Sequence, residues 1–177
     1  MERAVFLDRD GVINRVVERD GRMVSPRTLE DFEIFDFAAP AADVIRAAGF
    51  RIYVVTNQPD IARGLMTQAT LDVMLEQVRS AIAPDDVVVC PHDDSDLCDC
   101  RKPKPGMLTA LASKHDVDLS RSFFVGDSWK DIDAGAAAGV PTVLIRREDN
   151  RKTRGDYEAE DLLAAAHLIA SLARREE

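Results

Sequence analysis

The sequence has few of the features that mark membrane, secreted or nucleic-acid-binding proteins. No apolar run in its 177 residues approaches the 18 or more that a membrane-spanning helix needs. Near the N-terminus only residues 4–7 are apolar before acidic residues follow, which is too short a stretch for a signal peptide. Basic residues number 23 against 32 acidic ones, so the formal charge of −9 argues against nucleic acid as the main partner. We therefore expect a cytoplasmic protein with neither a membrane nor a nucleic-acid partner. Separately, we expect it to be a monomer.

Cysteine is also scarce, and its placement is informative. The three cysteines are too few for a paired disulfide framework, and all fall within residues 90–100. In a reducing compartment such a cluster with a histidine favours a metal over disulfides, the alternative being three buried free thiols. Four nitrogen and sulfur ligands with no open position suit tetrahedral Zn²⁺ in a structural role. The predicted ligands of this zinc are Cys90, His92, Cys98 and Cys100.

The remaining composition is that of a globular α/β protein. Hydrophobic residues make up 46% and charged residues 31%, and the length suits one domain spanning residues 1–177. Short apolar runs predict strands at residues 4–7, 51–55, 87–89, 122–125 and 142–145. Helical composition separates or follows them at residues 40–48, 70–82, 106–114, 131–138 and 162–174. Apolar strands that alternate with helices predict a doubly wound, mostly parallel sheet with helices on both faces.

Polar side chains follow three of the predicted strands at the point where each strand ends. Asp8 and Asp10 come after the first strand, Thr56 and its two successors after the second, and Asp127 after the fourth. In doubly wound folds ligands gather beyond the carboxyl ends of the strands. Three neighbouring carboxylates repel one another unless a hard cation lies between them, and oxygen-only ligands suit Mg²⁺. Each aspartate taken alone could instead be a turn residue or a helix cap.

A basic, proline-rich loop at residues 101–106 supplies the opposite charge. Three of its six residues are cations, and a helix is predicted to start where the loop ends. A phosphate beside carboxylates needs such a counter-charge, and a helix N-terminus adds amide donors. Thr56 could add a hydroxyl, and with Asn57 backbone N–H groups, for phosphate oxygens. The sequence thus predicts a site for Mg²⁺ and a small phosphorylated metabolite, although a solvated basic loop is the simpler alternative.

Four segments in order resemble the haloacid-dehalogenase-like phosphatases. They are residues 8–14 (DRDGVIN), 55–58 (VTNQ), 101–107 (RKPKPGM) and 125–127 (VGD). With the cysteine–histidine cluster before the basic loop, the chain is similar to the D-glycero-D-manno-heptose 1,7-bisphosphate phosphatases and the related histidinol-phosphate phosphatases. The resemblance spans about residues 4–145. It implies a Mg²⁺-dependent phosphomonoester hydrolase, best assigned to the heptose bisphosphate, with histidinol phosphate as the alternative substrate.

The resemblance also implies roles for the strand-end residues. Asp8 would attack phosphorus to give an aspartyl-phosphate, and Asp10 would act as general acid and then general base. The carboxylates of Asp8 and Asp127 and the backbone carbonyl of Asp10 would hold Mg²⁺. Thr56 and Lys102 would stabilise the transferring phosphoryl oxygens.

Further residues are expected around the substrate. The resemblance assigns Arg101 to substrate recognition, and we group Asn57 and Gln58 with it as substrate-binding residues. Asp131 could orient metal-bound waters or could simply be an acidic residue at a helix start. Asp10 and Thr56 are only 46 positions apart, which leaves no room for a separate cap domain. Specificity is therefore expected to come from the zinc loop and from residues 15–26, which contain an Asp-Gly turn signal.

Some residues depart from the pattern of the heptose enzymes. Ser128 follows Asp127 where those enzymes commonly have lysine, and the Pro-Asp pair at residues 59–60 replaces a small pair. A sugar bisphosphate favours an extra cation, for which Lys130 and Arg22 are the candidates.

Two rival functions belong to other classes. A receiver-like phosphoacceptor lacks the second acid that Asp10 provides. A zinc-ordered interaction module leaves Thr56, Lys102 and Asp127 unexplained.

Overall fold

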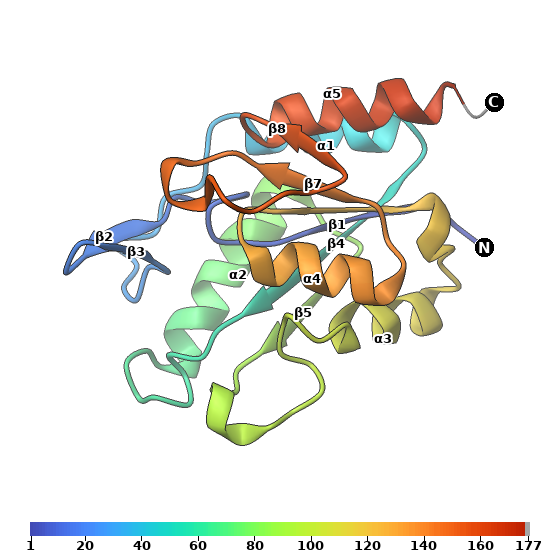
Figure 1. Cartoon of the computed structure of the whole chain (residues 1–177). Coiled ribbons are helices and arrows are strands. Elements are labelled where there is room, and N and C mark those ends of the chain that lie inside the picture. Colours follow the sequence, from blue (N-terminus) through green and yellow to red (C-terminus); the bar gives the residue numbers. More distant parts are fainter. Residues whose placement is uncertain (176–177) are drawn as a thin grey trace.

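Strand β1 (Ala4–Leu7) lies near the middle of a six-stranded parallel sheet in the order β5-β4-β1-β6-β7-β8. This computed structural model describes residues 1–175 (Figure 1). The other strands of the sheet are β4 (Arg51–Asn57), β5 (Asp86–Cys90), β6 (Phe123–Gly126), β7 (Thr142–Ile145) and β8 (Tyr157–Ala159). β1 pairs with β4 on one side and β6 on the other, so the strand order reverses at β1. The predicted doubly wound parallel sheet is confirmed.

Helices cover both faces of the sheet, which explains why its central strand β1 is apolar throughout. On one face α1 (Ala38–Ala47), α2 (Gln68–Ile82) and α5 (Leu162–Ala173) pack on Val5 and Leu7 of β1. On the other face α3 (Gly106–His115) and α4 (Trp129–Ala138) pack around Ala4 and Phe6. Successive strand residues point to opposite faces, so a strand buried on both sides reads as a continuous apolar run.

The segment between β1 and α1 holds an antiparallel hairpin that projects from the body of the molecule (Figure 1). Its strands are β2 (Val17–Arg19) and β3 (Arg22–Val24), and Asp20 and Gly21 form its turn with φ of 51° and 72°. Positive φ at both central positions is what a tight hairpin turn requires, and Asp-Gly favours it. Within residues 1–175 no cap domain is inserted here, as expected from the short spacing.

Most predicted boundaries agree with the structure to within one or two residues. β4 is longer than predicted and carries Thr56 and Asn57 inside the strand, where they pair with β5. Gly139 ends α4 with φ of 73°, the left-handed conformation that glycine adopts without a steric penalty. Among the residues described, no helix combines the length and the apolar character that a membrane span requires.

Candidate active site

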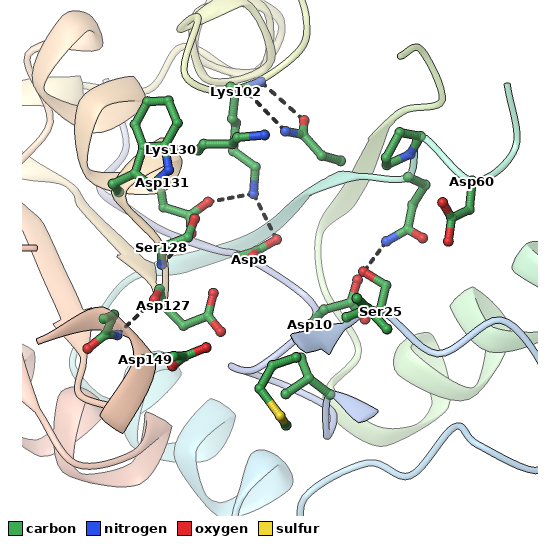
Figure 2. A pocket seen from close by; sticks show the side chains of 18 of the residues that line it. Asp8, Asp10, Ser25, Asp60, Lys102, Asp127, Ser128, Lys130, Asp131 and Asp149 are labelled. Carbon is green, nitrogen blue, oxygen red and sulfur yellow. Dashed lines mark hydrogen bonds and ion pairs between the residues drawn. The ribbon is translucent and has the colours of Figure 1, made fainter. Parts of the chain in front are cut away.

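The predicted catalytic and substrate-binding residues other than Thr56 line a cavity of about 490 Å³ at the carboxyl ends of β1, β4 and β6, whereas Thr56 is buried and does not line it. Asp8 follows β1, Asn57 ends β4 and Asp127 follows β6, so all three lie where the strand order reverses. This crevice is where parallel α/β sheets bind ligands. Figure 2 shows Asp8, Asp10, Lys102 and Asp127 around the same space. The cavity also receives Arg101 from the zinc loop and Lys130 and Asp131 from α4.

Lys102 is held at the centre of the site by two carboxylates. Its Nζ forms ion pairs with Oδ1 of Asp8 and Oδ1 of Asp131, each at 2.7 Å, and it also donates a hydrogen bond of 3.0 Å to the carbonyl of Val55. Burial by itself lowers the pKa of Lys102, but the two carboxylate charges outweigh it and raise that pKa. Lys102 therefore stays cationic next to Asp8, as the predicted phosphoryl-stabilising role requires.

Asn57 holds the backbone of Lys102 in place. Its Oδ1 accepts from the Lys102 N–H at 3.1 Å, and its Nδ2 donates to the Lys102 carbonyl at 3.0 Å. Both the oxygen and the nitrogen of the Asn57 amide are thus bonded to the backbone of Lys102, so Asn57 positions that cation. The Asn57 side chain also borders the cavity. Its predicted contact with substrate rests on that position alone.

The donor set fits a magnesium ion. One carboxylate oxygen from each of Asp8, Asp127 and Asp131 lies within 4.8 Å of the others. Burial raises the pKa of Asp8 to about 7, helped by the charge of Asp131 and opposed by Lys102. Burial and the charge of Asp8 likewise raise the pKa of Asp127. Clustered carboxylates with raised pKa values need a cation to stay ionised together, and oxygen ligands suit Mg²⁺. Both oxygens of Asp131 are already in use, Oδ1 in the ion pair with Lys102 and Oδ2 as acceptor from Ser128. Asp8 and Asp127 each use only one carboxylate oxygen within the described residues, which favours them as the carboxylates for the metal.

Asp10 faces away from this carboxylate pair. Its Oδ1 accepts from Arg9 Nη2 at 2.8 Å and from Asn14 Nδ2 at 2.9 Å, and its Oδ2 accepts from Gln58 Nε2 at 2.8 Å. Burial by itself raises the pKa of Asp10, but the charge of Arg9 and these hydrogen bonds outweigh it and lower that pKa. The free protein thus holds Asp10 ionised. Arg9 is fully buried, and its pairing with Asp10 was not foreseen from the sequence.

Thr56 and Gln58 are linked to each other and to Asp10. Gln58 Nε2 donates to Thr56 Oγ1 at 2.9 Å as well as to Asp10, while Gln58 Oε1 is buried without a hydrogen-bond partner. Thr56 Oγ1 accepts this bond, so its own hydroxyl hydrogen is not committed to Gln58. Gln58, predicted to bind substrate, borders the cavity with its amide nitrogen already committed to these two partners.

The four zinc candidates form a compact cluster. Cys90 Sγ lies 3.6 Å from both Cys98 Sγ and His92 Nδ1, while Cys100 Sγ lies 3.3 Å from His92 Nδ1 and 3.5 Å from Cys98 Sγ. A tetrahedral site with Zn–S bonds of about 2.3 Å has ligand–ligand edges of about 3.8 Å. The four ligands therefore surround a space that fits zinc.

The cluster fixes the loop that carries Arg101. Arg101 donates from Nε to Oδ1 of Asp94 at 2.6 Å and from Nη1 to the carbonyl of His92 at 3.2 Å. Gly106, where α3 starts, is needed for this packing, since a Cβ there would lie 2.2 Å from the carbonyl oxygen of Asp99. Lys104 turns outward to the carbonyl of Cys98, so the site uses Lys102.

Two residues after β7, Arg147 and Asn150, also reach the site without being predicted from the sequence. Arg147 Nη1 donates to Asp127 Oδ2 at 2.8 Å, and Asn150 Nδ2 donates to the Asp127 carbonyl at 2.8 Å. Gly11 lies against the Arg147–Asp127 ion pair, since a Cβ there would be 1.9 Å from Asp127 Oδ2. The sequence does show that β7 also ends at this edge of the sheet. The polar residue Asn150, however, comes only after a further turn that follows β7.

The comparisons with known proteins agree with this geometry. The HAD-hydrolase-like family model matches residues 99–174. Proteins named D-glycero-beta-D-manno-heptose-1,7-bisphosphate 7-phosphatase from Pseudomonas putida and Pseudomonas aeruginosa are each 38% identical, over 85% and 94% of this chain and 86% and 93% of their own. The crystal structure of D,D-heptose 1,7-bisphosphate phosphatase from B. bronchiseptica, complexed with magnesium and phosphate, superposes with a TM-score of 0.84. It is 32% identical and covers 96% of this chain and 99% of its own.

The matches to the Pseudomonas aeruginosa protein and to the solved structure extend over almost the whole chain. The predicted resemblance is thereby confirmed, and the phosphoacceptor and interaction-module alternatives are set aside. The chain is a phosphatase, and it belongs to the haloacid-dehalogenase-like family of the D-glycero-D-manno-heptose 1,7-bisphosphate phosphatases.

Proposed function

We propose that this protein removes the 7-phosphate from D-glycero-D-manno-heptose 1,7-bisphosphate, with Asp8 as the nucleophile. The observation that carries the proposal is the position of Lys102, whose Nζ donates to Oδ1 of Asp8 at 2.7 Å, just beyond the carboxyl end of β1. Asp8 thus lies next to the cation of Lys102 and near the carboxylate of Asp127. This arrangement suits a phosphoryl group that is bound against Asp8. The substrate is supported by the relatives that bear this name over most of the chain.

In the first step an oxygen of Asp8 attacks phosphorus, and the bond from phosphorus to the sugar oxygen breaks. Asp10 gives a proton to the departing oxygen, and an aspartyl-phosphate remains on Asp8. Lys102 and the Thr56 hydroxyl donate to the phosphoryl oxygens, which stabilises the charge spread over them. When bound by Asp8 and Asp127, Mg²⁺ supplies positive charge that offsets the repulsion between the nucleophile and the phosphate.

In the second step Asp10 takes a proton from water, the water oxygen attacks phosphorus, and the bond to Asp8 breaks to release phosphate. Ionised Asp10 is the form this step needs, and Arg9 and Gln58 hold it in that form in the free protein. The first step needs protonated Asp10, so the charge of the incoming phosphate must raise its pKa.

A substrate panel tests the proposal. Phosphate release with Mg²⁺ is measured for both anomers of the heptose bisphosphate and for histidinol phosphate, with Asp8→Asn as the control. We expect a preference for one heptose anomer and no turnover by the variant. A preference for histidinol phosphate would leave the mechanism intact and replace the substrate.

We also propose that residues 1–177 form one domain that acts as a monomer, since every residue of the proposed site comes from one chain. Sedimentation of the Mg²⁺-loaded protein checks this state. The thiolates of the zinc cluster favour a reducing compartment such as the cytoplasm.

A further inference from the structure

The basic residues that line the cavity are almost all neutralised by neighbouring aspartates. Seven aspartates and six basic residues border it. Arg27 lies 2.6 Å from Asp60, Arg63 contacts Asp60 and Asp93, and Arg147 contacts Asp127 and Asp149. Lys102 and Arg101 have the carboxylate partners described above. A substrate with two phosphates therefore enters a cavity in which nearly every basic side chain is already paired with an aspartate.

Among the described basic residues that line the cavity, Lys130 is the one without a carboxylate partner. It makes no hydrogen bond or ion pair with any described residue, and its Nζ lies 5.8 Å from the centre of the Trp129 ring. It is partly buried in the first turn of α4, and Figure 2 shows it extending on the side of the cavity where Lys102 lies. Holding an ammonium group in a cavity without a carboxylate leaves its charge available to an anionic ligand.

The neighbourhood of Lys130 contains one further cation that a ligand can reach. Arg101, its partner Asp94 and Lys130 all line the same cavity, and Arg101 Nε donates to Asp94 Oδ1 at 2.6 Å. Asp94 is 73% exposed, so an incoming phosphate can replace it on Arg101 at little desolvation cost. The other candidate cation, Arg22, lies at the exposed turn of the β2–β3 hairpin and does not border the cavity.

We propose that Lys130, together with Arg101, binds the second phosphate of the substrate, the one that is not hydrolysed. This assignment rests on the proposed function, because it presupposes a bisphosphate whose other phosphate sits against Asp8. Ser128 cannot serve in its place: its hydroxyl caps α4 by donating to Asp131 Oδ2 at 2.6 Å. Lys130 is thus a specificity-determining residue that this chain supplies three positions after Asp127.

The test compares heptose 1,7-bisphosphate with heptose 7-phosphate, which differ only in the second phosphate. Kinetics are measured with Mg²⁺ for the wild type, Lys130→Met, the conservative Lys130→Arg and the control Lys104→Met, whose cation lies outside the cavity. We expect Lys130→Met to raise KM for the bisphosphate about 10- to 100-fold, the effect of one charge-assisted hydrogen bond. Its kcat, and both constants for the monophosphate, should stay within about twofold, and Lys130→Arg should restore most of the loss.

Other results would overturn the assignment. Equal losses on both substrates would make Lys130 structural, and an unchanged KM for the bisphosphate, or a loss as large in Lys104→Met, would remove its role. A wild type that does not prefer the bisphosphate would also refute the second-phosphate site while leaving the phosphatase intact. Absence of turnover on both substrates and on p-nitrophenyl phosphate would instead refute the proposed function.

Discussion

Replacing Lys102 with methionine should destabilise the Mg²⁺-free protein and abolish turnover. The Lys102 side chain is 2% exposed and contacts two carboxylates, of which Asp131 is 1% and Asp8 is 12% exposed. Breaking a buried ion pair by removing one partner costs roughly 3–5 kcal/mol, because the remaining charge is left uncompensated. For a domain of this size that corresponds to a fall in Tm of about 6–20 °C.

Calorimetry at pH 8 measures this effect, with Lys104→Met as the matched control. Lys104 is exposed and its partner Asp99 fully so, and its loss should change stability by no more than about 0.5 kcal/mol. The double variant Lys102→Met/Asp8→Asn should lose less than the sum of the two single variants, because it leaves one fewer unpaired buried charge. Strict additivity, or a Lys102→Met variant as stable as the control, would refute the account of this pair.

Three further perturbations follow from the site. Burial and the charge of Asp131 raise the pKa of Asp8 to about 7, so Asp8 binds a proton more tightly in the folded state than in the unfolded state. The stability of the Mg²⁺-free protein should therefore fall as pH rises from 5 to 8, which a series of Tm measurements would show. Saturating Mg²⁺ should remove this pH dependence. Cys98→Ser should lower the zinc content from about one per chain and weaken substrate binding through Arg101, as metal analysis and KM would show; a zinc-free, fully active protein would contradict this. Arg147→Met should tighten Mg²⁺ binding in calorimetric titration, because Arg147 repels the metal and competes for Asp127; unchanged affinity would count against that competition.

The convergence of the site was predictable because parallel strands deliver their carboxyl ends to one edge. That rule alone brought Asp8, Asp127 and the residues at the end of β4 together. The zinc cluster was predictable for a different reason, since its four ligands lie within eleven consecutive residues. Local sequence sufficed there because a short loop can surround a metal without help from distant elements.

The partners of individual side chains were not predictable. Asn57 and Gln58 are polar residues at the end of β4, which favours contact with a ligand, yet their amides bind Lys102, Asp10 and Thr56. Whether the side-chain amide of Asn57 faces a ligand or binds the backbone depends on the packing of the basic loop at Lys102, 45 residues away along the chain. The strands β2, β3 and β8 were missed because each has only three residues and a charged centre or start.

The most direct test of the central claim is to trap the phosphate on the enzyme. A rapid-quench experiment uses 2,4-dinitrophenyl phosphate labelled at phosphorus, whose leaving group needs no proton, with the wild type, Asp10→Asn and Asp8→Asn. We predict a hydroxylamine-sensitive phosphoryl group on Asp8 that accumulates in Asp10→Asn, because Asp10 activates the water of the second step. Asp8→Asn should carry no label while keeping its fold by circular dichroism. Label on another residue, or turnover in Asp8→Asn near that of the wild type, would contradict the account.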